Sequence, residues 1–240
     1  MFETVALITI VVVAAFIQGL TGFGFGLIAL PLLGLFLPLK MIIPLIIMLA
    51  LFISLTLSIQ LRHAIDWKKI TALSIATLPG IPLGIYILQN LPAEPLALSL
   101  GLVMVSFTSY QLLATPKTIN LGLPYTLSAG FACGVLTASI STGGPPVIIY
   151  AAMQPWSKDQ AKATVACFFF ISGFTTVVSH AISGLITTEV LYNFTISLPA
   201  LILGIFAGTF AYKRMSDHGY KSLALILVFL LGGMMIFENI

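Results

Sequence analysis

Charged side chains are scarce in this sequence, and none lies inside its apolar stretches. Asp, Glu, Lys and Arg make up 7 % of the 240 residues and hydrophobic residues 59 %, whereas about 25 % of an average soluble domain is charged. Apolar residues run continuously between the charges and do not alternate as the strands of a barrel would. The composition therefore excludes a soluble domain and predicts an all-α integral membrane protein.

Cysteine and histidine are nearly absent as well. Cys133 and Cys167 lie in apolar sequence without metal-ligand spacing, which predicts two buried thiols. Because no Lys or Arg lies within an apolar block, a tight cofactor site is not expected, and we predict neither a cofactor nor a metal. The net charge of +3 gives no reason to expect a nucleic-acid partner. Residues 1–3 lack the basic segment of a cleaved signal peptide.

The ten basic and seven acidic residues border eight charge-free blocks. Two of these blocks, residues 4–39 and 118–157, contain 36 and 40 residues. The other six contain 16 to 26 residues, near the roughly 20 that one membrane crossing needs. These six are residues 41–61, 70–93, 95–116, 163–188, 190–212 and 222–237.

The order of one long and three short blocks occurs twice, which suggests an internal duplication. The pattern Leu-Pro-x-x-x-Leu-Gly-Ile at residues 78–85 recurs at residues 198–205. We therefore predict a single membrane domain made of a first repeat, residues 1–117, and a second repeat, residues 118–240.

The loop charges predict that the two repeats are inverted. Residues 62–69 carry three basic residues, whereas the equivalent loop of the second repeat has only Glu189. Conversely, the loop at Glu94 has no basic residue, whereas its equivalent, residues 213–221, carries three basic residues. Basic residues collect on the cytoplasmic side, so equivalent loops should lie on opposite sides. If each long block crosses an even number of times, every Lys and Arg except Lys40 faces the cytoplasm, and both termini lie outside.

Each long block has a cluster of helix-breaking residues near its middle. Residues 18–26 hold four glycines, and residues 137–146 hold two glycines and two prolines; these disfavour a helix by about 1 and 3 kcal/mol per residue. In lipid, broken backbone is tolerated only where protein buries it or where it lines a cavity. We expect short helices around each break, residues 4–18 and 24–37 in the first block. A re-entrant hairpin would place each tip near the midplane, facing the other; two short full crossings are the alternative.

A helix that restarts after a break offers unpaired N–H groups and a partial positive charge. Glycine lets backbone approach a ligand closely, and hydroxyl and amide side chains add donors. The two breaks together therefore predict a neutral binding site for a small anion. The alternative is that the small residues serve only helix packing. The predicted substrate-binding residues are Gln18, Thr21, Gly22, Gly24, Gly26, Thr137, Ser139, Ser141, Thr142, Gly143 and Gly144.

A few further polar residues lie in the middle of apolar blocks. They either line the transport pathway or bond to carbonyls of their own helices. These candidates are Ser54, Thr56, Ser172, Thr175 and Thr176.

His180 is the only histidine inside an apolar block. Counting from the cytoplasmic end of its block places it near the outer surface, away from the serines of the second break. An intramembrane hydrolase that uses Ser139 or Ser141 as nucleophile and His180 as base is the rival hypothesis. A scaffold subunit without transport activity is a third.

Two segments resemble a known family. Residues 18–31, Gln-Gly-Leu-Thr-Gly-Phe-Gly-Phe-Gly-Leu-Ile-Ala-Leu-Pro, and residues 134–146, which end in Ser-Thr-Gly-Gly-Pro-Pro, are similar to the duplicated glycine-rich segments of the sulfite exporter TauE/SafE family of membrane permeases. The resemblance covers the whole chain in length and duplication. It implies a bacterial inner-membrane transporter of small sulfur-containing anions such as sulfite or organosulfonates.

Transport of such an anion is the leading hypothesis, with export as the expected direction. An interior-negative potential favours outward movement of one negative charge by about 2.3 kcal/mol per 100 mV. This gradient removes the need for a coupling ion, in keeping with apolar blocks that contain no acidic residue. The expected partners are the anion and the lipid bilayer.

Overall fold

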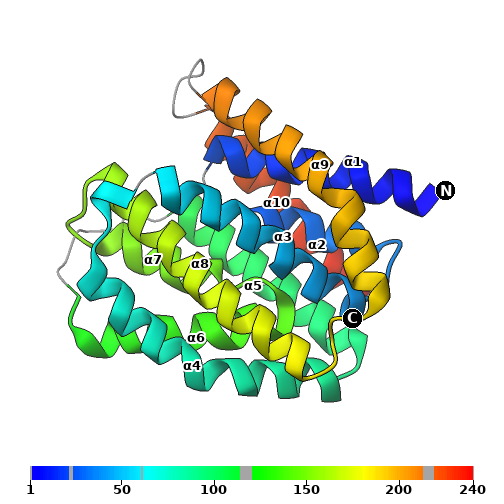
Figure 1. Cartoon of the computed structure of the whole chain (residues 1–240), viewed down its shortest axis with the longest axis horizontal. Helices are drawn as coiled ribbons and strands as arrows, with labels where there is room; N and C mark the ends of the chain where they lie inside the picture. Colours follow the sequence, from blue (N-terminus) through cyan, green and yellow to red (C-terminus); the bar gives the residue numbers. More distant parts are fainter. Residues whose placement is uncertain (1, 22–23, 61, 114–120, 213–218, 240) are drawn as a thin grey trace. The chain divides into compact units, whose positions relative to one another are not determined.

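The structure is a computed structural model that describes residues 2–21, 24–60, 62–113, 121–212 and 219–239. This part of the chain is helical, with no strand among its elements (Figure 1), so the predicted all-α class is confirmed. The helices are α1 (Phe2–Thr21), α2 (Phe25–Gly34), α3 (Leu39–Gln60), the 3-10 helix η1 (Arg62–Ala64), α4 (Trp67–Asn90), α5 (Ala93–Leu113), α6 (Leu123–Ile140), α7 (Gly144–Met153), α8 (Lys158–Ile182), α9 (Thr188–Tyr212) and α10 (Gly219–Glu238).

Most of these helices have the length and composition of membrane spans. Within the described residues, seven helices contain apolar windows of at least 18 residues: α1, α3, α4, α5, α6, α8 and α9. The helices α2 and α7 have ten residues each, which is about 15 Å at 1.5 Å per residue, half of the roughly 30 Å hydrocarbon core. The protein is therefore a multi-pass membrane protein with two half-length helices.

Both breaks occur in the predicted clusters, but the flanking helices differ from the predicted pair of similar lengths. In the first block α1 continues to Thr21 instead of ending at residue 18, and α2 ends at Gly34 instead of residue 37. Gly19 lies inside α1 and packs against α9: a Cβ there would lie 2.8 Å from the carbonyl oxygen of Ile205. The break therefore falls after Gly19, and each long block gives one helix of spanning length and one of half that length.

The chain divides into two compact units, and each draws on both halves of the sequence. Unit 1 contains Met1–Leu49, Leu91–Ala114 and Ile186–Ile240. Unit 2 contains Ala50–Asn90 and Thr115–Leu185. The first and second repeats, their boundaries and their inversion stay predictions.

In unit 1, α1 packs along α9 through glycines (Figure 1). A Cβ at Gly204 would lie 2.6 Å from the carbonyl oxygen of Val12, and one at Gly208 would meet that of Phe16. Real Cβ atoms do not approach so closely, so glycine allows the two backbones to touch. The remaining helices of this unit include α10, which packs against α5 and α2.

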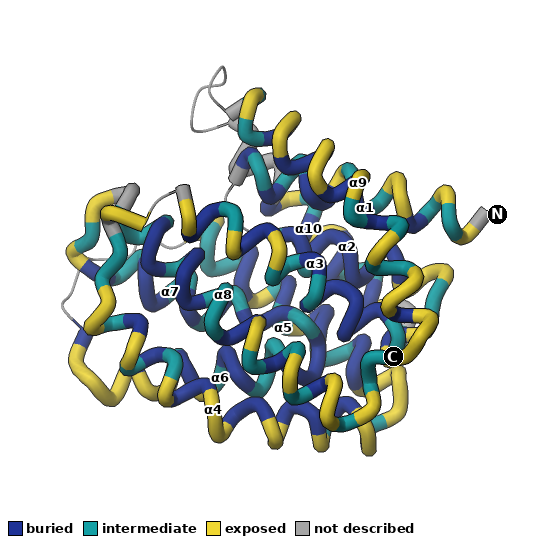
Figure 2. Tube along the Cα trace, viewed as in Figure 1, coloured by how far each residue is buried: buried dark blue, intermediate teal, exposed yellow. Residues whose placement is uncertain are grey.

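In unit 2, α4 and α6 make the corresponding pair. Cβ atoms at Gly80 and Gly84 would lie 2.5 Å from the carbonyl oxygens of Phe131 and Val135. Residues later in α4 contact residues later in α6, as Gly80 with Phe131 and Gly84 with Val135 show. The two helices are therefore parallel and begin at the same end. Gly84 and Gly204 lie 120 residues apart and serve the same kind of contact in the two units. Figure 2 shows buried residues on one side of α4 and exposed residues on the other.

A polar cluster fixes the start of α4 within unit 2. Asp66 accepts hydrogen bonds from the backbone N–H of Lys69 at 3.2 Å and from the indole N–H of Trp156 at 3.2 Å. The hydroxyl of Thr164 accepts one from the N–H of Asp66 at 3.0 Å. Both carboxylate oxygens of Asp66 are thus engaged, one of them in capping the helix.

Candidate functional site

The first break is built around Gly24. This residue precedes α2 with φ 101° and ψ 0°, a left-handed conformation that suits glycine and strains residues with a Cβ. A Cβ placed on Gly24 would meet nothing within 4 Å. Packing therefore does not explain this glycine, whereas backbone conformation does.

Gln18 joins the two sides of the first break. Its side-chain oxygen Oε1 accepts a hydrogen bond of 2.8 Å from the backbone N–H of Phe25, the first residue of α2. Gln18 is 8 % exposed and Phe25 1 % exposed, so the bond lies in a low-dielectric environment that strengthens it. Gln18, predicted as a ligand for the substrate, thus also acts as a helix cap.

The first turn of α2 has further amides directed toward the break. The N–H of Ile28 bonds to the carbonyl of Gly24 at 3.1 Å, and Gln18 takes that of Phe25. Helix α2 itself provides no acceptor for the amides of Gly26 and Leu27, because these precede its first intrahelical bond. Of the other predicted residues in this segment, Gly22 and the side chain of Thr21 lie outside the described residues.

The second break, between α6 and α7, has a different geometry. Ser141 follows α6 with φ 52°, and its N–H bonds to the carbonyl of Thr137 at 3.1 Å. The N–H of Thr142 bonds to the carbonyl of Leu136 at 3.2 Å. These bonds close the end of α6 in the manner of a left-handed C-cap.

The start of α7 offers few backbone donors. Pro145 and Pro146 follow Gly144 in its first turn, and proline has no N–H. Of the four N–H groups that open an ordinary helix, only those of Gly143 and Gly144 exist here. The second break therefore has a weaker backbone donor set than the first.

Gly143 is a packing residue. A Cβ there would clash with Oγ1 of Thr137 and would lie 2.7 Å from the carbonyl oxygen of Cys133. Both contacts are made with α6 in the same unit. At Gly144, by contrast, a Cβ would meet only ordinary contacts, the nearest at 3.4 Å. Helix packing, the alternative role of these small residues, thus explains Gly143 but does not explain Gly24.

The hydroxyls of the second break bond to nearby backbone. Ser139 donates to the carbonyl of Val135 at 2.7 Å, and Thr142 donates to that of Ile140 at 2.9 Å. Thr137 lies 3.5 Å from the sulfur of Cys133. The role of these hydroxyls as anion ligands stays a prediction. The hydroxyls of Ser139 and Thr142 already donate to backbone carbonyls.

The same local bonding occurs among the predicted pathway residues. The hydroxyls of Thr56, Thr175 and Thr176 lie 2.8 to 3.1 Å from carbonyl oxygens three or four residues earlier in their own helices. Ser54 and Ser172 are buried, and Ser172 lies 3.5 Å from the carbonyl of Phe169. Hydrogen bonding to their own helices therefore describes the three threonines and Ser172, and pathway lining stays a prediction for all five residues.

His180 was not predicted to lie near the second break, yet it does. Its Nε2 lies 3.0 Å from the carbonyl oxygen of Ala138, in the last turn of α6, and the residue is fully buried. No pattern in the sequence indicates this contact, which links the end of α8 to the end of α6. Because Nε2 is occupied by Ala138 and the hydroxyl of Ser139 by Val135, the serine–histidine hydrolase is not supported.

Interrupted helices among spans of full length are typical of membrane transporters. A family model described as Sulfite exporter TauE/SafE matches residues 7–235, and the chain belongs to this family. Membership implies membrane transport of sulfur-containing anions. Comparison with curated proteins finds no match, and comparison with solved structures finds none.

Proposed function

We propose that this protein exports a small sulfur-containing anion, such as sulfite or an organosulfonate, and that the anion contacts the start of α2. The observation that carries the proposal is Gly24, which is held left-handed with open space where a side chain would stand. A ligand can reach the first-turn amides there without meeting a Cβ. Family membership supports the class of substrate.

The chemistry of the first break suits weak binding of an anion. The start of α2 carries the positive end of the helix dipole, about half an elementary charge. Gln18 uses its oxygen on Phe25, and the other branch of its amide carries two N–H donors. Binding by dipoles and amides without a full positive charge favours release, as transport requires.

We assign the principal contacts to the first break because the second has fewer donors. Two prolines remove N–H groups from α7, and Gly143 packs against α6. The serine and threonine hydroxyls there remain secondary candidates. That the two breaks face each other near the midplane stays a prediction, as do the location of both termini outside and the bacterial inner membrane.

Flux into proteoliposomes tests the proposal. Purified protein should move labelled sulfite at a rate that depends on an imposed membrane potential, and excess organosulfonate should compete. A scaffold subunit would give no flux above protein-free vesicles. Absence of flux for sulfite, organosulfonates and thiosulfate alike would contradict the proposed function.

A further inference from the structure

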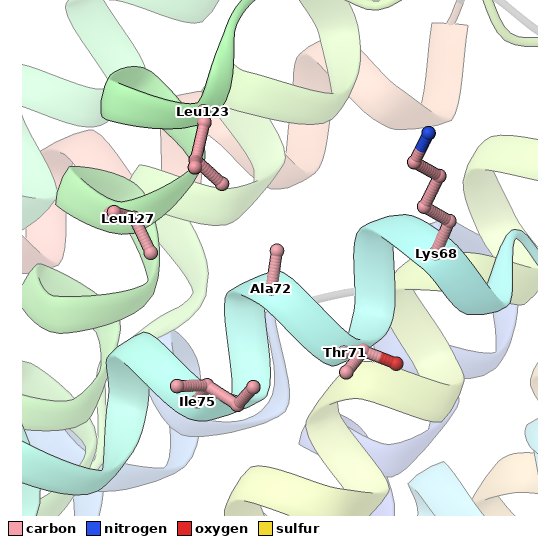
Figure 3. A pocket seen from close by; sticks show the side chains of 6 residues that line it. All are labelled: Lys68, Thr71, Ala72, Ile75, Leu123 and Leu127. Atoms are coloured by element: carbon pink, nitrogen blue, oxygen red, sulfur yellow. The ribbon is translucent and has the colours of Figure 1, made fainter.

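A groove lies on the exposed side of unit 2, between the beginnings of α4 and α6. It has a volume of about 420 Å³ and opens to the outside of the bundle. Figure 3 shows Leu123 and Ala72 pointing toward one another across the groove, with the ammonium group of Lys68 at one end. The lining residues are Lys68, Thr71, Ala72, Ile75, Leu123 and Leu127.

The groove combines one cationic end with an apolar floor. Ile75 and Leu123 are each 60 % exposed and Leu127 is 40 % exposed, although all three belong to candidate membrane spans. Such side chains meet lipid in a membrane protein. Thr71 adds little polarity, because its hydroxyl donates to the carbonyl of Trp67 in its own helix.

Aromatic residues place the charged end of the groove at the membrane surface. Trp67 begins α4 and is 61 % exposed, and Tyr125 lies in the first turn of α6 and is 63 % exposed. Exposed Trp and Tyr collect at the level of the lipid headgroups. Since α4 and α6 are parallel, both begin at this level, and both direct the positive ends of their dipoles to it.

Lys68 is available to an anionic group. The neighbouring acid, Asp66, accepts hydrogen bonds on both carboxylate oxygens, one from the backbone N–H of Lys69 and one from the indole N–H of Trp156. Lys69 itself turns away to the carbonyl of Leu121 at 3.3 Å and lies over the ring of Tyr150. Within the described part of unit 2, no carboxylate pairs with Lys68.

We propose that this groove binds an anionic glycerophospholipid of the surrounding leaflet. Its phosphate would lie at Lys68, and one acyl chain would run along Ala72 and Ile75 against Leu123 and Leu127. Charge complementarity at one end and apolar surface at the depth of the hydrocarbon fit this ligand better than a soluble anion. The site is separate from the break at Gly24 and does not depend on the proposed transport function.

Native mass spectrometry of the full chain, titrated with phosphatidylglycerol and phosphatidylcholine of equal chain length, tests the site. We expect one phosphatidylglycerol to bind about fivefold more tightly than phosphatidylcholine, the effect of one lysine at an anionic surface. Lys68→Gln should abolish this preference. Arg62→Gln, which removes an exposed basic residue of the same unit outside the groove, should retain it.

A second variant addresses the apolar part. Ala72→Leu should fill the groove and lower the occupancy of both lipids at this site. Equal binding of both lipids by the unaltered protein, or an unchanged preference in Lys68→Gln, would overturn the proposal. So would a dimer that Ala72→Leu dissociates regardless of added lipid, because the groove would then hold a second copy of the chain.

Discussion

The side-chain oxygen of Gln18 lies 2.8 Å from the backbone nitrogen of Phe25 and fastens α2 to α1 across the first break. Helix α1 ends at Thr21 and α2 begins at Phe25, and the buried amide of Gln18 connects the two helices directly. The direction of the first-turn amides of α2 therefore depends on a side chain from the preceding helix.

Gln18→Leu should destabilise the protein because it leaves the buried N–H of Phe25 without its acceptor, at a cost of about 1–3 kcal/mol. Thermal unfolding in detergent measures this loss. Gln18→Glu keeps an acceptor, so its melting temperature should remain closer to that of the unaltered protein.

The same pair of variants separates stability from function. Glutamate at residue 18 removes the two side-chain N–H donors of the amide, so sulfite flux in Gln18→Glu should fall about tenfold or more, equivalent to about 1.4 kcal/mol. Normal flux in a well-folded Gln18→Glu protein would be inconsistent with anion contact at this break.

Gly143→Ala should lower stability by about 1–3 kcal/mol, the usual cost of overpacking. The added methyl group collides with Thr137 and with the carbonyl of Cys133. Thr137→Ala should recover part of the loss, because it removes the side-chain collision but not the backbone one. Melting temperatures of both single variants and the double variant measure this coupling; simple additivity would show that the two residues do not collide.

His180→Leu should also destabilise the protein, by about 1–3 kcal/mol, since the carbonyl of Ala138 loses its buried donor. His180→Gln supplies an amide donor of similar reach and should recover part of the loss. Thermal unfolding compares them. If both variants have the same melting temperature as the unaltered protein, the hydrogen bond to Ala138 has no structural role.

The sequence predicted both breaks because their cause is local. Gly24 adopts a backbone that only glycine favours, and Pro145 with Pro146 can begin a helix but cannot continue one from the preceding turn. Helix ends were harder to predict. Gly19 has the same intrinsic helix propensity as Gly24, yet it lies inside α1, where it packs against α9.

The hydrogen bonds at the two breaks were not predicted from the sequence. The two prolines at the start of α7 can be read from the sequence. Because proline has no N–H, they reduce the number of backbone donors at the second break. The capping of α2 by Gln18 and the contact of His180 with Ala138 depend on how helices pack, which periodicity does not encode. Likewise the bonds of Ser139 and Thr142 to nearby carbonyls depend on side-chain rotamers.

Sulfite flux in Gly24→Ala tests the central claim most directly. Alanine at this left-handed position is strained by about 1–3 kcal/mol and redirects the first-turn amides, without colliding with a neighbour. Gly184→Ala is the matched control, because Gly184 also has a positive φ, 72°, and open space around it. At equal protein content in the vesicles, we predict that Gly24→Ala loses most of its flux while Gly184→Ala retains it. Equal flux in both variants would contradict anion binding at the first break.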